Sequence, residues 1–411
     1  MTALPPSVPD APASVPRGGH ELPARLAGTG AGAAAAPRTP RRKRTRFVLG
    51  FVGGAVVIAA LAITQLSASI GYDSAADENA DAVAAASTEK TQLQGTSTAL
   101  KAVADSAGLI LASENEAIVA PPEAEQSLAD AVTDAQDTAT AADDVITTEI
   151  VSAGEKPVWF WELFGASARL EQNTDDALEL TDDLRAEANE VTGASDAVTE
   201  NGVALLAAAG QATPAFEAAH ISARNDAVIG LRDAAADVIA TTIIDETAVS
   251  TYAALQTAAA QVVATENEEL AEKAGPLMNA RLEVEAFARE LAPGVLLEFD
   301  WAPIVNGAGN NGSMGGYTTW WWDEPDRSVI QLSNSVAEQW PAERSRALVA
   351  HEVGHAISVK CEDMYDSSTQ DSIEKWATGW AISMGFTDDA NGVWAYGYPP
   401  QSYIDAAAGC R

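Results

Sequence analysis

Basic residues are scarce in this chain, which has 24 Lys and Arg against 59 Asp and Glu and a net charge of −35. Residues 1–46 carry 8 basic and 2 acidic residues, a net of +6, which leaves −41 for the remainder. A net negative charge of this size argues against nucleic-acid or anionic-lipid binding by residues 47–411. It favours solubility or cationic partners.

Residues 1–46 also lack apolar periodicity and are rich in Pro, Ala, Gly and Arg. A segment of this composition cannot bury enough surface to offset the entropy of ordering. The sequence therefore predicts a disordered, basic N-terminal tail.

Charge is missing altogether from Phe47 to Leu66, a run of 20 residues. A helix of about 20 apolar residues crosses a hydrocarbon core. Six basic residues cluster just before the run: Arg38, Arg41, Arg42, Lys43, Arg44 and Arg46. Basic residues that flank a first span stay on its cytoplasmic side. We expect a transmembrane signal anchor over 47–68, with a cytoplasmic N-terminus and everything after it outside the cell membrane.

A cleaved signal peptide is the alternative, since Ser67-Ala68-Ser69 is a small-residue triplet that processing enzymes accept. The basic region is too long for a signal peptide and the apolar run exceeds its usual core, so an uncleaved, single-pass anchor is favoured. No Cys follows the run closely, which excludes a lipoprotein-type anchor.

Aromatics and strand-like alternation are nearly absent from about residue 73 to residue 275, where Ala and acidic residues predominate. This composition predicts long helices. Because Pro and Gly interrupt helices, we expect breaks at Pro121-Pro122, at 154–157 and at 210–214, giving four helical segments.

One predicted segment has apolar residues at steps of seven, as a supercoiled helix requires: Leu163, Leu170, Ala177, Leu184, Val191, Val198 and Leu205. A second has mixed steps of three and four from Leu128 to Ile146. Polar residues at 173, 187 and 201 weaken the coiled-coil seam and favour an antiparallel bundle. The bundle would be a stalk or a partner-binding surface, or simply an all-helical domain.

Aromatic residues gather only between the second and third segments, at 158–164. Helices running out and back would return this stretch toward the membrane, where Trp prefers the interface. Packing over the end of the bundle is the favoured interpretation.

From residue 277 to residue 411, Trp, Tyr, Gly and short apolar runs replace the Ala-rich pattern. This predicts a separate α+β domain, with a leading helix before Leu291, strands at 295–301, 317–322 and 328–332, and a helix after Pro341. Trp320, Trp321 and Trp322 are expected in its core rather than along a substrate subsite.

Histidine is the scarcest chemistry-bearing residue, with four in the chain. Two of them, His351 and His355, flank Glu352 in an HExxH motif. Four residues apart on a helix, they project from one face and can reach one zinc ion. Glu352 would then act as general base toward a zinc-activated water that attacks a peptide bond. The lone His220 is expected to be a surface or satisfied core residue.

A catalytic zinc takes three protein ligands. No His follows His355, so the third ligand should be a carboxylate. Glu374 is the best candidate, because it lies 19 residues further on at the start of a predicted helix over 372–384. The other candidates are Glu362, Asp363, Asp366, Asp371, Asp388, Asp389 and Asp405.

Tyrosine and cysteine residues supply the remaining predicted roles. A transition-state oxyanion needs a donor besides zinc, for which Tyr396, Tyr398 and Tyr403 are the candidates. Two Cys in an oxidising compartment predict one disulfide, Cys361 to Cys410. A zinc-ligand role for Cys361 is the alternative.

The motif from His351 to His355, followed by Glu374, Ala377 and Trp380-Ala381, resembles the gluzincins, zincin peptidases with a glutamate ligand. More narrowly, the last 115 to 135 residues are similar to bacterial membrane-anchored putative neutral zinc metallopeptidases. The resemblance implies that strand 328–332 lines the substrate cleft. Such proteins often have an acidic residue where Thr378 stands, so Thr378 or Asp371 would have to orient a histidine ligand.

Together these patterns predict a membrane-tethered zinc metallopeptidase that acts on proteins or peptides outside the cytoplasm. The alternative is a structural or partner-binding envelope protein whose helical region does the work and whose zincin-like domain is weak or inactive.

Overall fold

The structure is a computed structural model that describes residues 48–113 and 117–411, with side chains from residue 56 onward. The described chain is mostly helical and holds one small mixed sheet. It divides between Gln65 and Leu66 into two units. The predicted tail at 1–46 lies outside the described residues, and the predicted boundary at residue 277 lies within the second unit.

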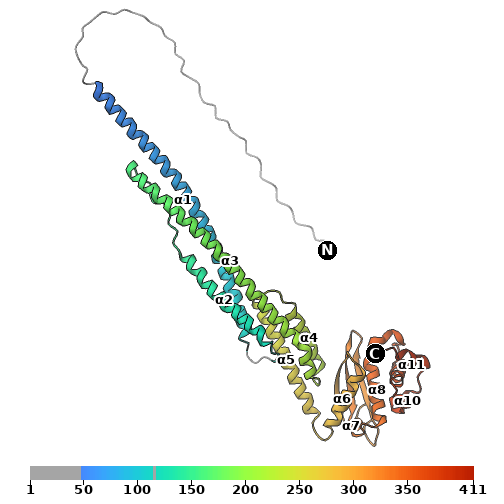
Figure 1. Ribbon diagram of the computed structural model, residues 1–411. Helices are drawn as coiled ribbons and strands as arrows, with labels where there is room; N and C mark the ends of the chain where they lie inside the picture. The colour runs from blue at the N-terminus through green and yellow to red at the C-terminus, as the bar shows by residue number, and fades with distance from the viewer. Residues whose placement is uncertain (1–47, 114–116) are drawn as a thin grey trace, which may run out of the picture. The chain divides into compact units, whose positions relative to one another are not determined.

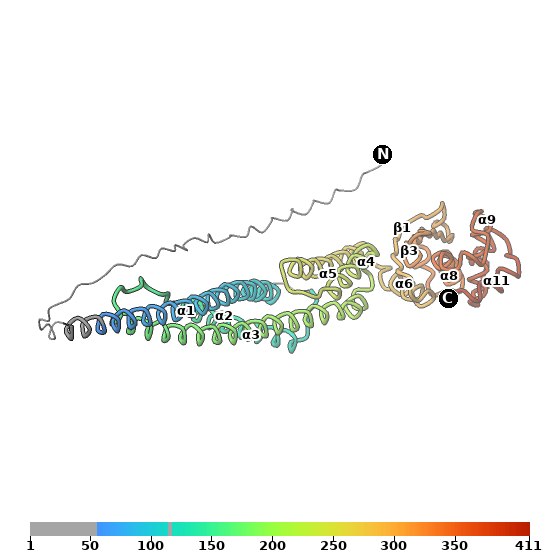
Figure 2. Tube along the Cα trace, turned by 90° about the horizontal axis from the view of Figure 1, so that it is seen from above, coloured from blue at the N-terminus to red at the C-terminus, as the bar shows by residue number. Residues whose placement is uncertain are grey.

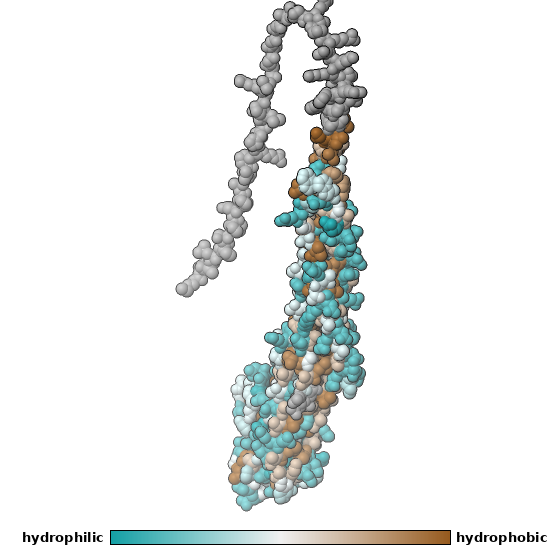
Figure 3. All heavy atoms as spheres, turned by 90° about the vertical axis from the view of Figure 1, so that its left-hand side faces the viewer, coloured by the Kyte–Doolittle hydropathy of each residue, from teal (hydrophilic) through white to brown (hydrophobic). Residues whose placement is uncertain are grey.

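Helix α1, Val48–Leu111, begins with an apolar stretch. The side chains of Val56, Ile58 and Ile63 are 62%, 70% and 65% exposed. Figure 3 shows hydrophobic side chains at the described start of this helix, whereas the surface of the helices that follow is largely hydrophilic. By length and composition α1 can cross a membrane.

Four more helices complete the helical region: α2 Pro122–Thr147, α3 Phe160–Ala219, α4 Asn225–Ile239 and α5 Glu246–Glu272. Consecutive helices run in opposite directions, with α1, α2 and α3 side by side and α4 packed on α3 and α5 (Figures 1 and 2). Leu93 and Leu100 of α1 are fully buried in the core that these helices share.

The predicted heptad seam of α3 is confirmed, since all seven of its residues are buried. The α2 pattern is confirmed as well, with Leu128, Ala131, Ala135, Ala139 and Ala142 buried and Ile146 packed against them. Small residues on both helices allow the two backbones to approach closely.

The predicted break at 210–214 is wrong, because α3 continues through Pro214 and ends at Ala219. Proline there removes one backbone hydrogen bond. Packing compensates: a Cβ on Gly210 would lie 2.7 Å from Ile239, so α4 passes as close as a glycine permits. The chain turns instead at 220–224 and again between α4 and α5. Up to Glu272 the described residues form five helices, because α1 combines the predicted span with the first predicted segment and the fourth predicted segment divides into α4 and α5.

The C-terminal part is α+β, as expected. Its elements are α6 Met278–Leu291, β1 Leu296–Ala302, β2 Gly316–Trp321, β3 Glu324–Ser333, α7 Asn334–Glu338, α8 Glu343–Ser358, η1 Val359–Met364, α9 Gln370–Ser383, η2 Asp389–Asn391, α10 Val393–Tyr396 and α11 Gln401–Ala407. Strand β3 pairs parallel with β1 and antiparallel with β2. The predicted strands therefore form one mixed sheet.

One expectation about this sheet must be corrected. The resemblance implied that residues 328–332 line the cleft, but they belong to β3, the central strand of the order β1-β3-β2. Strand β2 lies at the sheet edge and reaches the motif helix, since the Thr318 hydroxyl lies 3.0 Å from the backbone oxygen of Glu352. The short hairpin makes β2 and β3 neighbours, but sequence spacing does not show which of the two pairs with β1.

A buried ion cluster joins the helical region to the C-terminal part. Lys273, after α5, lies 3.2 Å from both Glu269 of α5 and Glu285 of α6. Glu285 is fully buried and also accepts a 3.0 Å hydrogen bond from the Trp301 indole of β1. Removing one partner of such a cluster leaves an uncompensated charge, so the cluster specifies how α5 meets α6.

The two cysteines lie at disulfide distance, as predicted, with Cα atoms 6.0 Å apart. The carbonyl of Cys410 accepts a 3.0 Å bond from the indole of Trp380, which is fully buried on α9. The C-terminus is thus held against α9 and the end of the motif helix.

The α3 seam makes a stability prediction. Leu184 is 1% exposed, whereas Leu178 on the same helix is 50% exposed. Leu184→Ala should lower the free energy of unfolding by about 2–5 kcal/mol, because it leaves a cavity between packed helices. The matched change Leu178→Ala should alter it by less than about 0.5 kcal/mol. Chemical denaturation followed by circular dichroism measures both, and equal effects would contradict the assigned seam.

Candidate metal centre

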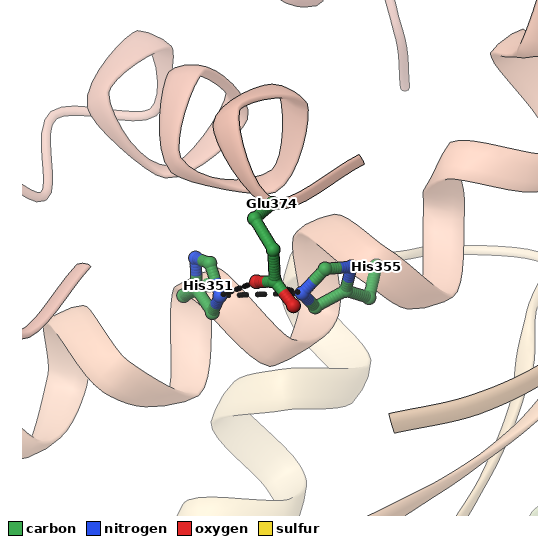
Figure 4. Close-up of side chains that lie close together, drawn as sticks. All are labelled: His351, His355 and Glu374. Carbon is green, nitrogen blue, oxygen red and sulfur yellow. Dashed lines mark hydrogen bonds and ion pairs between the residues drawn. The ribbon is translucent and has the colours of Figure 1, made fainter. Parts of the chain in front are cut away.

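The motif residues lie on α8 and are buried. His351, Glu352 and His355 are 5%, 5% and 4% exposed, although helix surfaces normally keep such residues in water. Apolar neighbours on the same helix, among them Val349, Val353 and Ile357, fix it in the core. Its two imidazoles project from one face, as the spacing predicts (Figure 4).

Glu374 comes to them from α9. The close approach of the two helices depends on Gly354, where a Cβ would lie 2.8 Å from the backbone oxygen of Ala377. Glu374 Oε2 lies 3.2 Å from His351 Nε2 and 3.1 Å from His355 Nε2. Of the eight carboxylates considered from the sequence, Glu374 is thus the one placed at the histidine pair.

These three atoms fit one metal ion. The two Nε2 atoms are 3.2 Å apart, so all three separations fall between 3.1 and 3.2 Å. Tetrahedral ligands at about 2.0–2.1 Å from zinc would be about 3.3 Å apart. The cluster could therefore hold a metal ion, in the ligand set of two His and one Glu that catalytic zinc uses.

The tautomer of His351 supports this assignment. The Thr378 hydroxyl lies 2.8 Å from the carbonyl of Glu374, to which it donates, and 3.4 Å from His351 Nδ1, from which it can then accept. This places the imidazole proton on Nδ1 and a lone pair on Nε2. A lone pair and a carboxylate oxygen then face each other, an arrangement that a cation stabilises.

Thr378, one of two residues proposed to orient a histidine, is therefore in place. Asp371 is not: its carboxylate pairs with Lys375 at 2.8 Å and is 73% exposed. Asp371 lies in the first turn of α9, on a face that points to solvent. Gly392 completes the site of His351, because a Cβ there would lie 2.7 Å from the ring.

His355 is held by an aromatic ring. Trp320 of β2 stacks on it, with ring centroids 5.3 Å apart and planes at 3°. The Nδ1 atom of His355 has no hydrogen-bond partner among the described residues. Trp320 thus contacts the site as well as the domain core, whereas Trp322 is 43% exposed.

Glu374 is positioned for one-point ligation. Gln370, one turn earlier on α9, donates a 2.8 Å hydrogen bond to Oε1 and leaves Oε2 toward the histidines. Burial alone would raise the pKa of Glu374, but when the imidazoles of His351 and His355 are protonated, their hydrogen bonds and charges outweigh burial and hold that pKa well below its usual value. The carboxylate is therefore ionised, as a metal ligand must be.

Glu352 also points toward β2 but contacts Thr318 rather than the histidine pair. The Thr318 hydroxyl lies 2.7 Å from its Oε2, and a Cβ on Gly316 would clash with its carboxylate. Burial raises the pKa of Glu352, while His351 and Thr318 oppose that change. The carboxyl group is thus close to the histidine pair, but is not part of it.

Among the three tyrosine candidates, the structure places Tyr396 at the centre. Its ring stacks on His351 at 5.8 Å, and burial together with the charges of Glu374 and Glu352 raises the pKa of Tyr396 to about 12. Tyr403 instead lies 2.6 Å from the Ser372 hydroxyl, and Tyr398 is 65% exposed. A neutral phenol therefore faces the site.

A cleft of about 270 Å³ opens beside His351 and Glu352. Gly315 and Gly316 form one wall, and the segment with Tyr396 forms the other. A larger cavity of about 670 Å³, between α3, α4 and β1, is lined by none of the metal-centre residues.

Sequence reasoning missed several residues of the centre. Gln370 could have been found, because it lies one helical turn before Glu374. Gly316, Thr318 and Trp320 lie at every second position of β2 and so share one face of the strand. Which face of β2 meets α8 depends on the sheet order. Gly392 has no sequence signal beyond its type.

In comparisons with protein-family models, curated proteins and solved structures, nothing matches this chain.

The ligand assignment predicts a difference between two acidic residues on α9. The purified full chain should bind about one zinc per molecule. Glu374→Ala should lower the bound metal well below that, because it removes one of three donors. Asp371→Ala should retain it, since Asp371 faces solvent. Elemental analysis after dialysis measures both, and equal metal contents in the two variants would refute Glu374 as a ligand.

Proposed function

We propose that this chain is a zinc metallopeptidase of the zincin type, with His351, His355 and Glu374 as metal ligands. One observation carries the proposal: three converging donors lie beside a fourth buried group, Glu352, whose carboxylate accepts a hydrogen bond from Thr318 and is not one of the three. A purely structural site with three such donors would not need a buried carboxylate at its open side.

Zinc, when bound, would supply Lewis-acid activation of a water molecule and of the peptide carbonyl. Glu352 would accept the proton from the attacking water and deliver it to the leaving amine. Thr318 holds one oxygen of Glu352, which leaves the other for the water. Tyr396, beside His351, would donate a hydrogen bond to the developing oxyanion.

Strand β2 gives the substrate a place to bind. Within the described residues, β2 pairs with β3 on one edge. An extended peptide added along the other edge would run past Gly316 and Thr318. Thr318 bonds to Glu352, and Gly316 lies so close that a Cβ there would meet the Glu352 carboxylate. The peptide backbone would therefore pass the general base.

The apolar start of α1 supports a tether. Its exposed side chains favour a bilayer, and the basic residues before it favour a cytoplasmic N-terminus. The metallopeptidase would then act outside the cytoplasm at the cell membrane, on proteins or peptides. The acidic bundle between anchor and centre does not favour nucleic acid as a partner.

A structural or partner-binding role for the helical region is the second candidate. It is favoured by the length of α3, which has 60 residues. Peptide cleavage at the metal centre does not require a helical bundle of that length. The two roles differ in whether Glu352 matters.

Glu352→Gln should lower peptide cleavage by about 10²- to 10⁴-fold, because the base is lost, while the three ligands stay. Cleavage of a broad peptide library by the full chain, with metal content measured in parallel, tests this. A wild type that holds zinc and is as inert as the variant would favour the second candidate.

The tyrosine assignment has its own matched pair. Tyr396→Phe should lower kcat by about 10²- to 10³-fold, because one oxyanion donor is lost. Tyr398→Phe should leave kcat unchanged, because its side chain is exposed. Steady-state kinetics on one peptide compares them, and similar rates for both variants would exclude Tyr396 from the reaction.

A further inference from the structure

The connection between α2 and α3 leaves large aromatic side chains in solvent. Trp159, Trp161 and Phe164 are 54%, 59% and 55% exposed, and we call these three residues the aromatic tip. The two indoles stack, with centroids 5.1 Å apart and planes at 4°. The expectation that this stretch packs over the end of the bundle is wrong for these residues.

Neighbouring residues on α3 do pack inward. Leu163 is fully buried in a small core with Ala68 and Tyr72 of α1, and Phe160 packs against that core. Helix periodicity explains the difference, since Leu163 belongs to the heptad seam while residues 161 and 164 lie on other faces. The tip therefore stays outside because the seam faces α1.

Polar contacts fix the tip to one level of α1. Lys156 donates hydrogen bonds of 2.8 Å to Ser69 and 2.6 Å to Asp73. The Tyr72 hydroxyl donates to the carbonyl of Gly154 at 3.3 Å. All three α1 residues lie within seven positions of Leu66, the last residue of the predicted apolar run, and α1 is one continuous helix there.

A rise of 1.5 Å per residue places this level within about 10 Å of the end of the apolar run. That is the depth of the head-group region, where Trp side chains concentrate because their rings are apolar and their N–H groups need a polar partner. Scattered apolar residues on a surface need no explanation, but three adjoining aromatics at this level do.

We propose that the aromatic tip inserts into the lipid head-group region of the membrane that α1 spans. The proposal rests on the proposed tether. The tip is a second membrane contact, on α3 rather than α1, and two contacts from different helices restrict how far the bundle can tilt.

Charge identifies the kind of lipid surface. Between residues 150 and 164 the chain has Glu155, Lys156 and Glu162, and Lys156 is paired with Asp73. No free cationic cluster is thus available in this segment for anionic head groups. The tip binds through its rings, so zwitterionic lipid suffices and added salt has little effect.

The test uses the full chain in phosphatidylcholine vesicles whose acyl chains are brominated near the head group, which quenches nearby tryptophans. Two of the chain's ten tryptophans lie in the tip. The double variant Trp159→Phe/Trp161→Phe should lose most of the quenching that the wild type shows. Trp394→Phe removes an indole that is 81% exposed on α10 and should retain it.

Vesicle flotation after an alkaline wash reports separately on the span. Flotation with the expected quenching, unchanged at high salt, supports the tip contact. Flotation with equal quenching in wild type and double variant overturns the tip contact and leaves the tether intact. A chain that does not float overturns both. Tip indoles shielded from a soluble quencher in detergent, but not quenched by bromolipid, indicate a second copy of the chain and also overturn the proposal.

Discussion

The close approach of α9 to α8 at Gly354 is the constraint on which the metal centre depends. With no Cβ at this position, the backbone of Ala377 lies against the motif helix. That contact brings both Glu374 and Thr378, one turn apart on α9, to His351. A ligand and the residue that orients another ligand are therefore set by a single helix–helix contact, and any side chain at 354 would displace both together.

Most of the correct sequence predictions followed from the spacing of residues along a helix. The HExxH residues share a helical face because of a four-residue step, and elimination left a carboxylate as third ligand. The α3 seam was equally local, since a seven-residue period places its members on one side of a helix whatever lies opposite. Such predictions succeed because backbone geometry alone determines them.

Errors arose where tertiary contacts decide. Pro214 stays within α3 because α4 packs beside Gly210, and no local rule includes that neighbour. The sheet order made β2, rather than β3, the strand at Glu352. Tyr396 could be chosen over its neighbours only from the fold, because the end of α10 stacks Tyr396 on His351 while Tyr398, two residues later, is exposed. The membrane orientation and the activity remain predictions.

The Cys361–Cys410 bond closes a ring of chain with a sequence separation of 49. That ring contains Glu374, Thr378 and Tyr396, whereas both histidines precede it. A nick in an exposed turn of the ring would leave every site residue covalently attached to the rest of the chain. Cleavage at this end of the molecule therefore produces no free fragment until the bond is reduced.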